Sequence, residues 1–319
     1  MTYTVNISSD VTRTIPKLAS QKDHLAREIR DFSSARAGFE AILRSLHLGE
    51  AAVLLPAYIG WSAREGSGVF DPIQNLNLRH KFYALDENLR IDLNSIKECL
   101  SAGKVGAMLI IHYFGYVDPG YREAVQMARE ANVFVIEDAA HALLSDLIGG
   151  SCGRLGDACI YSFHKLLPLS QGGGAIHASL PEVSNDGQAN TGRSRWQNFD
   201  LYTIASRRIA LAKHLDGRIA GLMPFVQPLW GLPGPGEIVQ TYPVLIRGFD
   251  RDQLYTDMNE SGFGVVSLYH TMISAIATDL FPKSHKIAKS ILNLPVHQDT
   301  STEAIDAMVD RLQALVTPK

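Results

Sequence analysis

The sequence predicts an α/β fold with a mostly parallel central sheet covered by helices, followed by a smaller α+β domain. Short apolar runs alternate with amphipathic stretches over the first two-thirds of the 319 residues. These runs are apolar on both faces, which is typical of parallel strands that helices cover. A stretch rich in Pro and Gly, residues 222–236, then marks the boundary of a short C-terminal region.

Hydrophobic spacing predicts the elements of the first part in order. They are a helix over 35–48, a strand over 51–55 that Pro56 stops, a strand over 105–111, a helix over 121–131 and a strand over 133–136. Polar and aromatic residues follow three of these strands, at Tyr58 and Trp61, at 112–115 and at 138–141. Because ligands bind beyond the carboxyl ends of parallel strands, we expect a site there.

The rest of the chain predicts an exposed polar loop and then alternating elements. The loop covers 181–200, and the elements are a helix over 201–215, a strand over 241–247, a helix over 251–261 ended by Gly262, a strand over 290–295 and a helix over 302–316. The predicted domains are therefore a large one, residues 1–215, and a small C-terminal one, residues 216–319.

Composition argues against several classes of protein. Hydrophobic residues make up 46% and charged residues 20%, and the net charge of −3 leaves no basic footprint for nucleic acid. No apolar run is long enough to span a bilayer, and the N-terminus lacks the pattern of a signal peptide. The cysteines and histidines lack metal-binding spacing, so we expect no metal site. Three cysteines are expected to be free thiols, which favours the cytoplasm.

Most of the chemical information lies in residues 133–176. An apolar run ends there in the acid pair Glu137-Asp138, and Ser162, Lys165 and the glycine run 172–174 follow. A buried acid, a lysine and a glycine turn are the groups that a pyridoxal 5'-phosphate (PLP) enzyme needs. The acid keeps the pyridine nitrogen protonated, and the lysine amine holds the aldehyde. The glycine run does not match a dinucleotide-binding fingerprint, and we interpret it as a tight turn.

These motifs resemble those of the DegT/DnrJ-type PLP-dependent sugar-nucleotide aminotransferases, which have the aspartate-aminotransferase fold (fold type I). Residues 135–142, VIEDAAHA, resemble the family's V-I-E-D-A-A-[QH]-A, and 156–164 resemble its G-D-x-x-x-[FY]-S-F-[HY]. Shorter matches run in the same order along the chain, at 33–38, 54–58, 111–115 and 288–296. The resemblance therefore covers the chain from about residue 30 to its C-terminal region.

The resemblance implies a role for each candidate residue. Asp138 would pair with the pyridine nitrogen, and Lys165 would hold the cofactor and then move a proton as general base and acid. Five further residues would bind the cofactor's phosphate or its ring. The resemblance implies Ser162 for the phosphate, together with Ser34 and Ala35 at the start of the first helix. It implies His141 for the phenolic oxygen. Trp61, with Tyr58 as the alternative, is expected to stack on the pyridine ring.

Read from the residues alone, each candidate has a plainer explanation. Asp138 could cap a helix, and Ser34 could be an ordinary N-cap without any ligand. Lys165 could be a solvated surface charge, as most lysines are. Ser162 could be a hydroxyl satisfied at a strand end, and His141 a ring packed in a wall.

Three features depart from the family pattern. Ser162 and Lys165 are three residues apart, where the family has five, and Gln171 replaces the acid before the glycines. The segment between residues 175 and 241 is short. The family carries there an N-[FY]-R element that reaches the partner subunit's cofactor phosphate, and the nearest match here, 198–200, lacks the arginine. The candidates to replace it are Arg193, Arg195, Arg207 and Arg208.

The function that the resemblance implies is transfer of an amino group from an amino acid, by analogy glutamate, to a keto group of a nucleotide-linked sugar. That reaction would serve polysaccharide biosynthesis, and the family works as homodimers. Two alternatives stay open. One is a PLP-dependent sugar dehydratase, in which a histidine takes the lysine's place, as His164 could here. The other is a degenerate homologue that binds PLP or a sugar nucleotide without turnover.

Overall fold

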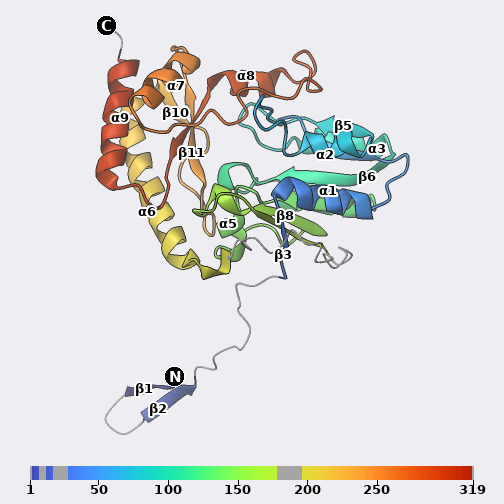
Figure 1. Ribbon diagram of the computed structural model, residues 1–319, viewed down its shortest axis with the longest axis horizontal. Helices are drawn as coiled ribbons and strands as arrows, with labels where there is room; N and C mark the ends of the chain where they lie inside the picture. Colours follow the sequence, from blue (N-terminus) through green and yellow to red (C-terminus); the bar gives the residue numbers. More distant parts are fainter. Residues whose placement is uncertain (1, 7–11, 17–27, 178–195, 318–319) are drawn as a thin grey trace.

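The protein is described by a computed structural model that covers residues 2–6, 12–16, 28–177 and 196–317. Its main feature is a seven-stranded sheet with the strand order β3-β9-β8-β7-β6-β4-β5 (Figure 1). The strands are β3 (Arg30–Phe32), β4 (Ala52–Pro56), β5 (His80–Tyr83), β6 (Val105–Ile111), β7 (Phe134–Asp138), β8 (Ala158–Ser162) and β9 (Gly173–Ile176).

The five strands from β8 to β5 run parallel, and β9 and β3 are antiparallel to their neighbours. Strands β4 and β8 are buried at every residue, as expected of strands covered on both faces. The predicted α/β fold with a mostly parallel sheet is therefore confirmed. The carboxyl ends of β4, β6 and β7 meet at one edge, and this places the segments after Pro56, Ile111 and Asp138 together.

Helices cover this sheet. They are α1 (Ala35–Ser45), α2 (Phe70–Asn75), α3 (Leu93–Ser101), α4 (Tyr121–Glu130) and α5 (Leu143–Leu147). Helix α1 packs on β8 and β9, and α4 packs on β7 beside α3. Ser34 caps α1 and Asp92 caps α3 with their side-chain oxygens, as expected at helix N-termini.

The C-terminal region forms a second, three-stranded antiparallel sheet in the order β10-β11-β12. Its elements are α6 (Leu201–Ile219), β10 (Val226–Pro228), β11 (Thr241–Ile246), α7 (Arg251–Glu260), α8 (Pro282–Ser290), β12 (Ile291–Pro295) and α9 (Thr302–Val316). Helices α6 and α9 lie side by side at one end of the molecule (Figure 1). Buried apolar side chains of both regions form one continuous cluster.

Most predicted elements are present, with shifts of a few residues at their ends. The strand over 105–111 and the helix over 302–316 have the predicted bounds, whereas α1 ends at Ser45. Of the predicted loop over 181–200, residues 181–195 lie outside the described residues, and Trp196–Asn198 form a 3-10 turn. The predicted domain boundary after residue 215 falls inside α6, and the division into two domains stays a prediction.

Several elements were not predicted. They include β5, α2, α3 and α8, and an N-terminal antiparallel hairpin of β1 (Thr2–Asn6) and β2 (Thr12–Pro16). Strand β5 has the sequence HKFY, which has no clear apolar alternation. Its parallel pairing with β4 is what makes this segment a strand.

Candidate active site

Asp138 ends β7 at the edge where the parallel strands terminate. Its side chain is buried, with 6% exposed, and Oδ1 accepts the backbone N–H of Ala140 at 2.8 Å. Asp138 caps no helix, because α5 begins at Leu143 with Ala142 before it. Burial raises the pKa of Asp138, and the positive charge of Lys165 and the Ala140 N–H oppose this only in part. A buried carboxyl group with a cationic neighbour suits a protonated ring nitrogen.

Lys165 lies at the end of a single 3-10 turn, η2 (Phe163–Lys165), that directly follows β8. This tight turn accommodates the short spacing from Ser162 and points the amine back toward β7. Its Nζ atom lies 2.9 Å from Nε2 of His141. Lys165 is therefore half-buried against the site and is not a solvated surface charge. Burial lowers the pKa of its amine, and the negative charge of Asp138 opposes this shift.

The hydrogen bonds of His141 fix its tautomer beside that amine. The backbone N–H of Phe114 donates to Nδ1 of His141 at 3.1 Å, so a neutral ring must carry its proton on Nε2. Burial, and next the charge of Lys165, lower the pKa of His141 and favour the neutral ring. Nε2–H then faces the Lys165 amine, and this contact together with burial favours the uncharged form of the amine. An uncharged amine is the form that attacks a carbonyl group.

The predicted phosphate-binding groups meet around Gly173. Gly173 pairs with Ser162 across β8 and β9. A Cβ atom on Gly173 would lie 2.2 Å from the backbone nitrogen of Ala35 and 2.4 Å from the carbonyl carbon of Ser34. Strand β9 therefore approaches the N-terminus of α1 as closely as glycine allows. This arrangement brings the strand partner of Ser162 against a helix N-terminus, and such a terminus favours an anion.

Two of these hydroxyl groups already have partners within the chain. Oγ of Ser34 accepts the backbone N–H of Ala37 at 3.1 Å, as an N-cap does. Oγ of Ser162 lies 3.3 Å from Nδ1 of His164. The phosphate role of both residues, like that of Ala35, stays a prediction.

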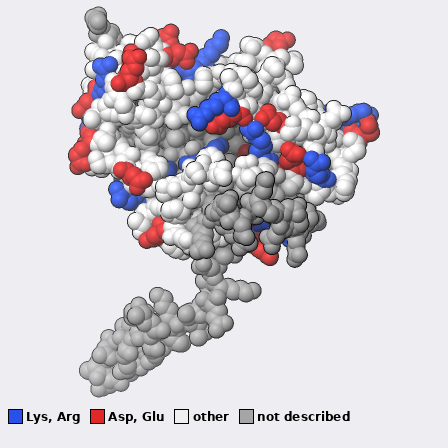
Figure 2. Space-filling model, viewed as in Figure 1, with Lys and Arg blue, Asp and Glu red and all other residues white. Residues whose placement is uncertain are grey.

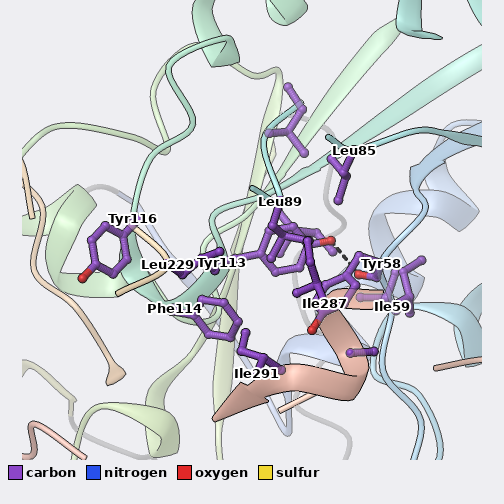
Figure 3. Close-up of a cluster of buried hydrophobic side chains, with 14 of the residues drawn as sticks. Tyr58, Ile59, Leu85, Leu89, Tyr113, Phe114, Tyr116, Leu229, Ile287 and Ile291 are labelled. Carbon is purple, nitrogen blue, oxygen red and sulfur yellow. Dashed lines mark hydrogen bonds between the residues drawn. The ribbon is translucent and has the colours of Figure 1, made fainter. Parts of the chain in front are cut away.

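The predicted stacking residue, Trp61, lies at the surface. Its side chain is 46% exposed, and its backbone N–H donates to the carbonyl of Thr271 at 2.9 Å. Tyr58 is fully buried in an aromatic cluster with Tyr113 (Figure 3). Tyr269, which the sequence did not indicate, joins the same cluster and comes from the connection between α7 and α8. Nothing in the sequence indicated this contact other than the aromatic side chain itself, because Tyr269 is far along the chain from Tyr58 and Tyr113.

Glu137 was predicted only as part of the acid pair, and the structure gives it a separate role. Its carboxylate accepts a hydrogen bond from Nε2–H of His112 at 2.8 Å. It also accepts hydrogen bonds from the backbone N–H groups of Gly153, Leu155 and Gly156. Burial alone would raise its pKa, but His112 and the Gly156 N–H outweigh burial and hold the pKa at about 2. Adjacent strand residues face opposite sides of a sheet, so Glu137 anchors the loop behind β7 while Asp138 faces the site.

Neither of two hollows in the described part of the chain coincides with Asp138 and Lys165. The larger, of about 640 Å³, lies at the amino ends of β4 and β5 and is lined by polar residues such as Arg79, Lys81 and Lys104. Among the described residues, no three His, Cys, Asp or Glu side chains gather where they could hold a metal ion. No helix in the described ranges is both long and apolar enough to cross a bilayer.

Residues 29–186, which contain Asp138, His141, Ser162 and Lys165, match the sequence profile of the DegT/DnrJ/EryC1/StrS aminotransferase family. This part of the chain belongs to that family. The resemblance inferred from the motifs is thereby confirmed.

Individual relatives agree with this assignment. The chain is 35% identical over 105 residues to dTDP-4-dehydro-2,3,6-trideoxy-D-glucose 4-aminotransferase of Saccharopolyspora spinosa, a match that covers 32% of this chain and 27% of that enzyme. It is 24% identical over 260 residues to GDP-perosamine synthase of Caulobacter vibrioides, covering 69% of this chain and 68% of the relative. The fold also matches the crystal structure of a DegT DnrJ EryC1 StrS aminotransferase from Brucella abortus, with a TM-score of 0.73 and 16% identity over 92% of this chain and 87% of that one.

Two of the four candidates for the arginine that the family resemblance implies lie within the part of the chain that the structure describes. Arg193 and Arg195 lie outside the described residues. Arg208 is buried and donates to the carbonyl oxygens of Val239 and Gln240, so its guanidinium group faces the interior. Arg207 is exposed on α6. Of these two, only Arg207 is placed where it could reach another molecule.

The residues present fit PLP. The donor set consists of a buried acid, an amine whose pKa burial lowers, and a serine on the strand beside Gly173, at Asp138, Lys165 and Ser162 respectively. These three kinds of group match the cofactor's ring nitrogen, aldehyde and phosphate.

Proposed function

We propose that this chain is a PLP-dependent aminotransferase that acts on a nucleotide-linked sugar. The observation that carries the proposal is the contact of 2.9 Å between Nζ of Lys165 and His141, in a site where Asp138 is buried. A solvated surface lysine would not lie half-buried between a histidine and a buried acid. The match of residues 29–186 to the DegT/DnrJ family supports the same proposal.

The side chains divide the work between them. PLP, when bound, supplies an electron sink for the reacting amino group. The Asp138 carboxylate would balance the charge of a protonated ring nitrogen, and the Lys165 amine would hold the cofactor's aldehyde group. The same amine, when free, would move a proton as general base and then as general acid. His141 would orient that amine through Nε2–H.

The substrates and setting are proposed from the relatives. Two of them are named for reactions on dTDP- and GDP-linked sugars, so the acceptor proposed here is a keto sugar of that kind, as polysaccharide biosynthesis requires, with glutamate as donor. We also propose a homodimer, which sedimentation would reveal at twice the chain's mass of 35.0 kDa. A cytoplasmic location is supported by Cys99, Cys152 and Cys159, which are free thiols.

The alternative dehydratase reaction has less support from the geometry. That reaction needs a histidine in place of the lysine. His164 is exposed and its Nδ1 lies beside Ser162, whereas Lys165 faces His141. The amine, and not the imidazole of His164, is therefore the group in position to react.

The first experiment is an absorbance spectrum of the purified protein with added PLP, before and after borohydride, for the wild type and Lys165→Ala. We expect a yellow species in the wild type that borohydride reduces, fixing the cofactor to a peptide that contains Lys165. The variant should show only free PLP. A yellow species that survives the substitution unchanged would refute the role of Lys165.

Titration with glutamate then separates an aminotransferase from a homologue that only binds. An aminotransferase passes the donor's amino group to the cofactor, so the yellow band should be replaced by the spectrum of the cofactor's amine form, with release of 2-oxoglutarate. A spectrum that glutamate and other amino acids leave unchanged would favour the degenerate binding homologue.

A further inference from the structure

An aromatic ring from the C-terminal region packs against residues of the candidate site. Tyr269 lies in the connection between α7 and α8. Its ring centroid is 5.2 Å from that of Tyr58, 5.5 Å from Tyr113, 6.2 Å from Phe114 and 6.1 Å from His141. Figure 3 shows three of these neighbours, Tyr58, Tyr113 and Phe114, close together in the buried cluster. Tyr269 is therefore in contact with the residue that orients the Lys165 amine.

Two backbone hydrogen bonds hold the Tyr269 segment against the strand end after β4. Trp61 donates its N–H to the carbonyl of Thr271 at 2.9 Å, and Ile273 donates to the carbonyl of Ile59 at 3.0 Å. Between them, a Cβ atom on Gly60 would lie 2.7 Å from Cδ1 of Tyr269. The tyrosine ring thus occupies the space that a side chain at position 60 would fill, and a glycine there leaves room for it.

The backbone of Tyr269 is strained to present this ring. Its φ angle is +64°, in the left-handed region that residues other than glycine rarely adopt. Such a conformation persists only where the surroundings determine it. Edge-to-face and tilted contacts with Tyr58, Tyr113 and Phe114 supply that support.

Tyr269 also lies within the electrostatic reach of the acid in the site. Burial, and next the negative charge of Asp138, raise the pKa of the Tyr269 hydroxyl. Trp61, in contrast, is exposed at the surface. Its side chain is 46% exposed, and it has no ring partner among the described residues. Among the aromatic residues after β4 and in the connection between α7 and α8, Tyr269 is the one whose ring lies near that of His141.

We propose that Tyr269, and not Trp61, supplies the aromatic face against the pyridine ring of the cofactor. The proposal rests on the proposed function, because it assumes that PLP binds above Asp138 and beside Lys165. A flat ring packed on a pyridine ring contributes affinity through stacking. The C-terminal region would in this way complete a site whose charged groups all come from the large sheet.

The test is the affinity of the apoprotein for PLP, measured by absorbance titration for the wild type, Tyr269→Phe, Tyr269→Leu and Tyr269→Ala. Stacking of this kind corresponds to roughly a 3- to 10-fold change in dissociation constant. We expect Phe to bind like the wild type, and Leu and Ala to bind about 3- to 10-fold more weakly. Tyr255→Ala, an exposed tyrosine on α7, is the matched control and should bind like the wild type.

The outcomes separate this proposal from the proposed function. If the wild type binds no PLP, the proposed function fails and this inference fails with it. If the wild type binds and Tyr269→Leu binds equally well or more tightly, only the inference about Tyr269 is overturned. Weakened binding by Trp61→Ala with unchanged binding by Tyr269→Leu would return the role to Trp61. The Leu variant keeps an apolar side chain of similar bulk, and far-UV circular dichroism checks that each variant is folded.

Discussion

At the scale of single residues, one backbone hydrogen bond fixes the tautomer of the histidine beside the candidate nucleophile. Phe114 adopts a φ angle of +58° and directs its N–H to Nδ1 of His141. The proton of the neutral imidazole is thereby confined to Nε2, which faces Lys165. This arrangement favours the uncharged amine in a site where burial already lowers the pKa of Lys165.

Glu137 gives a prediction about acid stability. Its pKa of about 2 lies below the ordinary value of 4.5 for a glutamate. Because the folded pKa is depressed, the stabilisation is fully present above about pH 4.5 and is lost as the pH falls through about 2. Glu137→Gln should therefore lower the free energy of unfolding at pH 7 by roughly 3 kcal/mol. Urea unfolding at several pH values measures this, and the difference between wild type and variant should shrink toward pH 2.

An exposed glutamate on α3 provides the control for that experiment. Glu98→Gln should change the free energy of unfolding by less than about 0.5 kcal/mol at every pH. If Glu137→Gln proves no more destabilising than Glu98→Gln, the buried carboxylate does not hold the loop of Gly153, Leu155 and Gly156 in the way described.

At the scale of elements, the close approach of β9 to the start of α1 brings the predicted phosphate-binding groups together. Gly173 belongs to β9 and also lies beside Ser162 of β8. Its missing side chain is what lets the N-terminus of α1 come near both strands. Helix α1 could not be moved away from Gly173 without also losing its packing on β8 and β9.

Gly173→Ala should accordingly be costly. The added methyl group would meet backbone atoms of Ser34 and Ala35, which cannot rotate away as a flexible side chain could. We expect the free energy of unfolding to fall by roughly 2–3 kcal/mol, together with weaker PLP binding. Gly217→Ala is the matched control. It lies in α6 with nothing within 4 Å of the new Cβ, and should stabilise the protein by up to about 1 kcal/mol.

Urea unfolding followed by circular dichroism measures both glycine variants. Similar stabilities of the two variants would contradict the close packing of β9 against α1. Normal stability of Gly173→Ala with lost PLP binding would instead show that the methyl group is accommodated by a shift of the phosphate-binding groups alone.

At the scale of the whole molecule, Arg208 joins the C-terminal region to the lysine turn. From α6 it donates to Oε1 of Gln298 at 2.8 Å and to the carbonyl of Leu166, the residue after Lys165, at 3.4 Å. Gln298 donates to the same carbonyl at 3.3 Å. Burial lowers the pKa of Arg208 to about 10, with the charge of Asp299 opposing the shift, so the group stays charged at neutral pH. The lysine turn is thus held by residues that are distant in sequence.

Two neighbouring arginines on α6 make this connection testable. Arg208→Met leaves buried carbonyl groups and Gln298 without their donor, and should lower the free energy of unfolding by about 2–3 kcal/mol. Arg207→Met removes an exposed charge and should cost less than about 0.5 kcal/mol. Denaturant unfolding compares the two. Equal effects would show that the buried guanidinium group does not tie the C-terminal region to the lysine turn.

Local sequence predicted well those features that depend on neighbours in the chain. The strand over 105–111 follows from a continuous apolar run, and the helix over 302–316 follows from the helical spacing of its apolar residues. The acid pair at the end of β7 and the motif around it indicated the family, which the match over residues 29–186 confirms. Helix α1, capped by Ser34, was also evident from spacing.

Tertiary structure decided what depends on residues brought together from afar. Strand β5 exists because it pairs with β4, and the tautomer of His141 beside Lys165 is fixed by the backbone N–H of Phe114. Tyr269 reaches the site from a segment between α7 and α8 that carries no local sign of it. Hydrophobic period and capping are encoded within a few residues, whereas burial, tautomer and ring packing arise only when the chain has closed on itself.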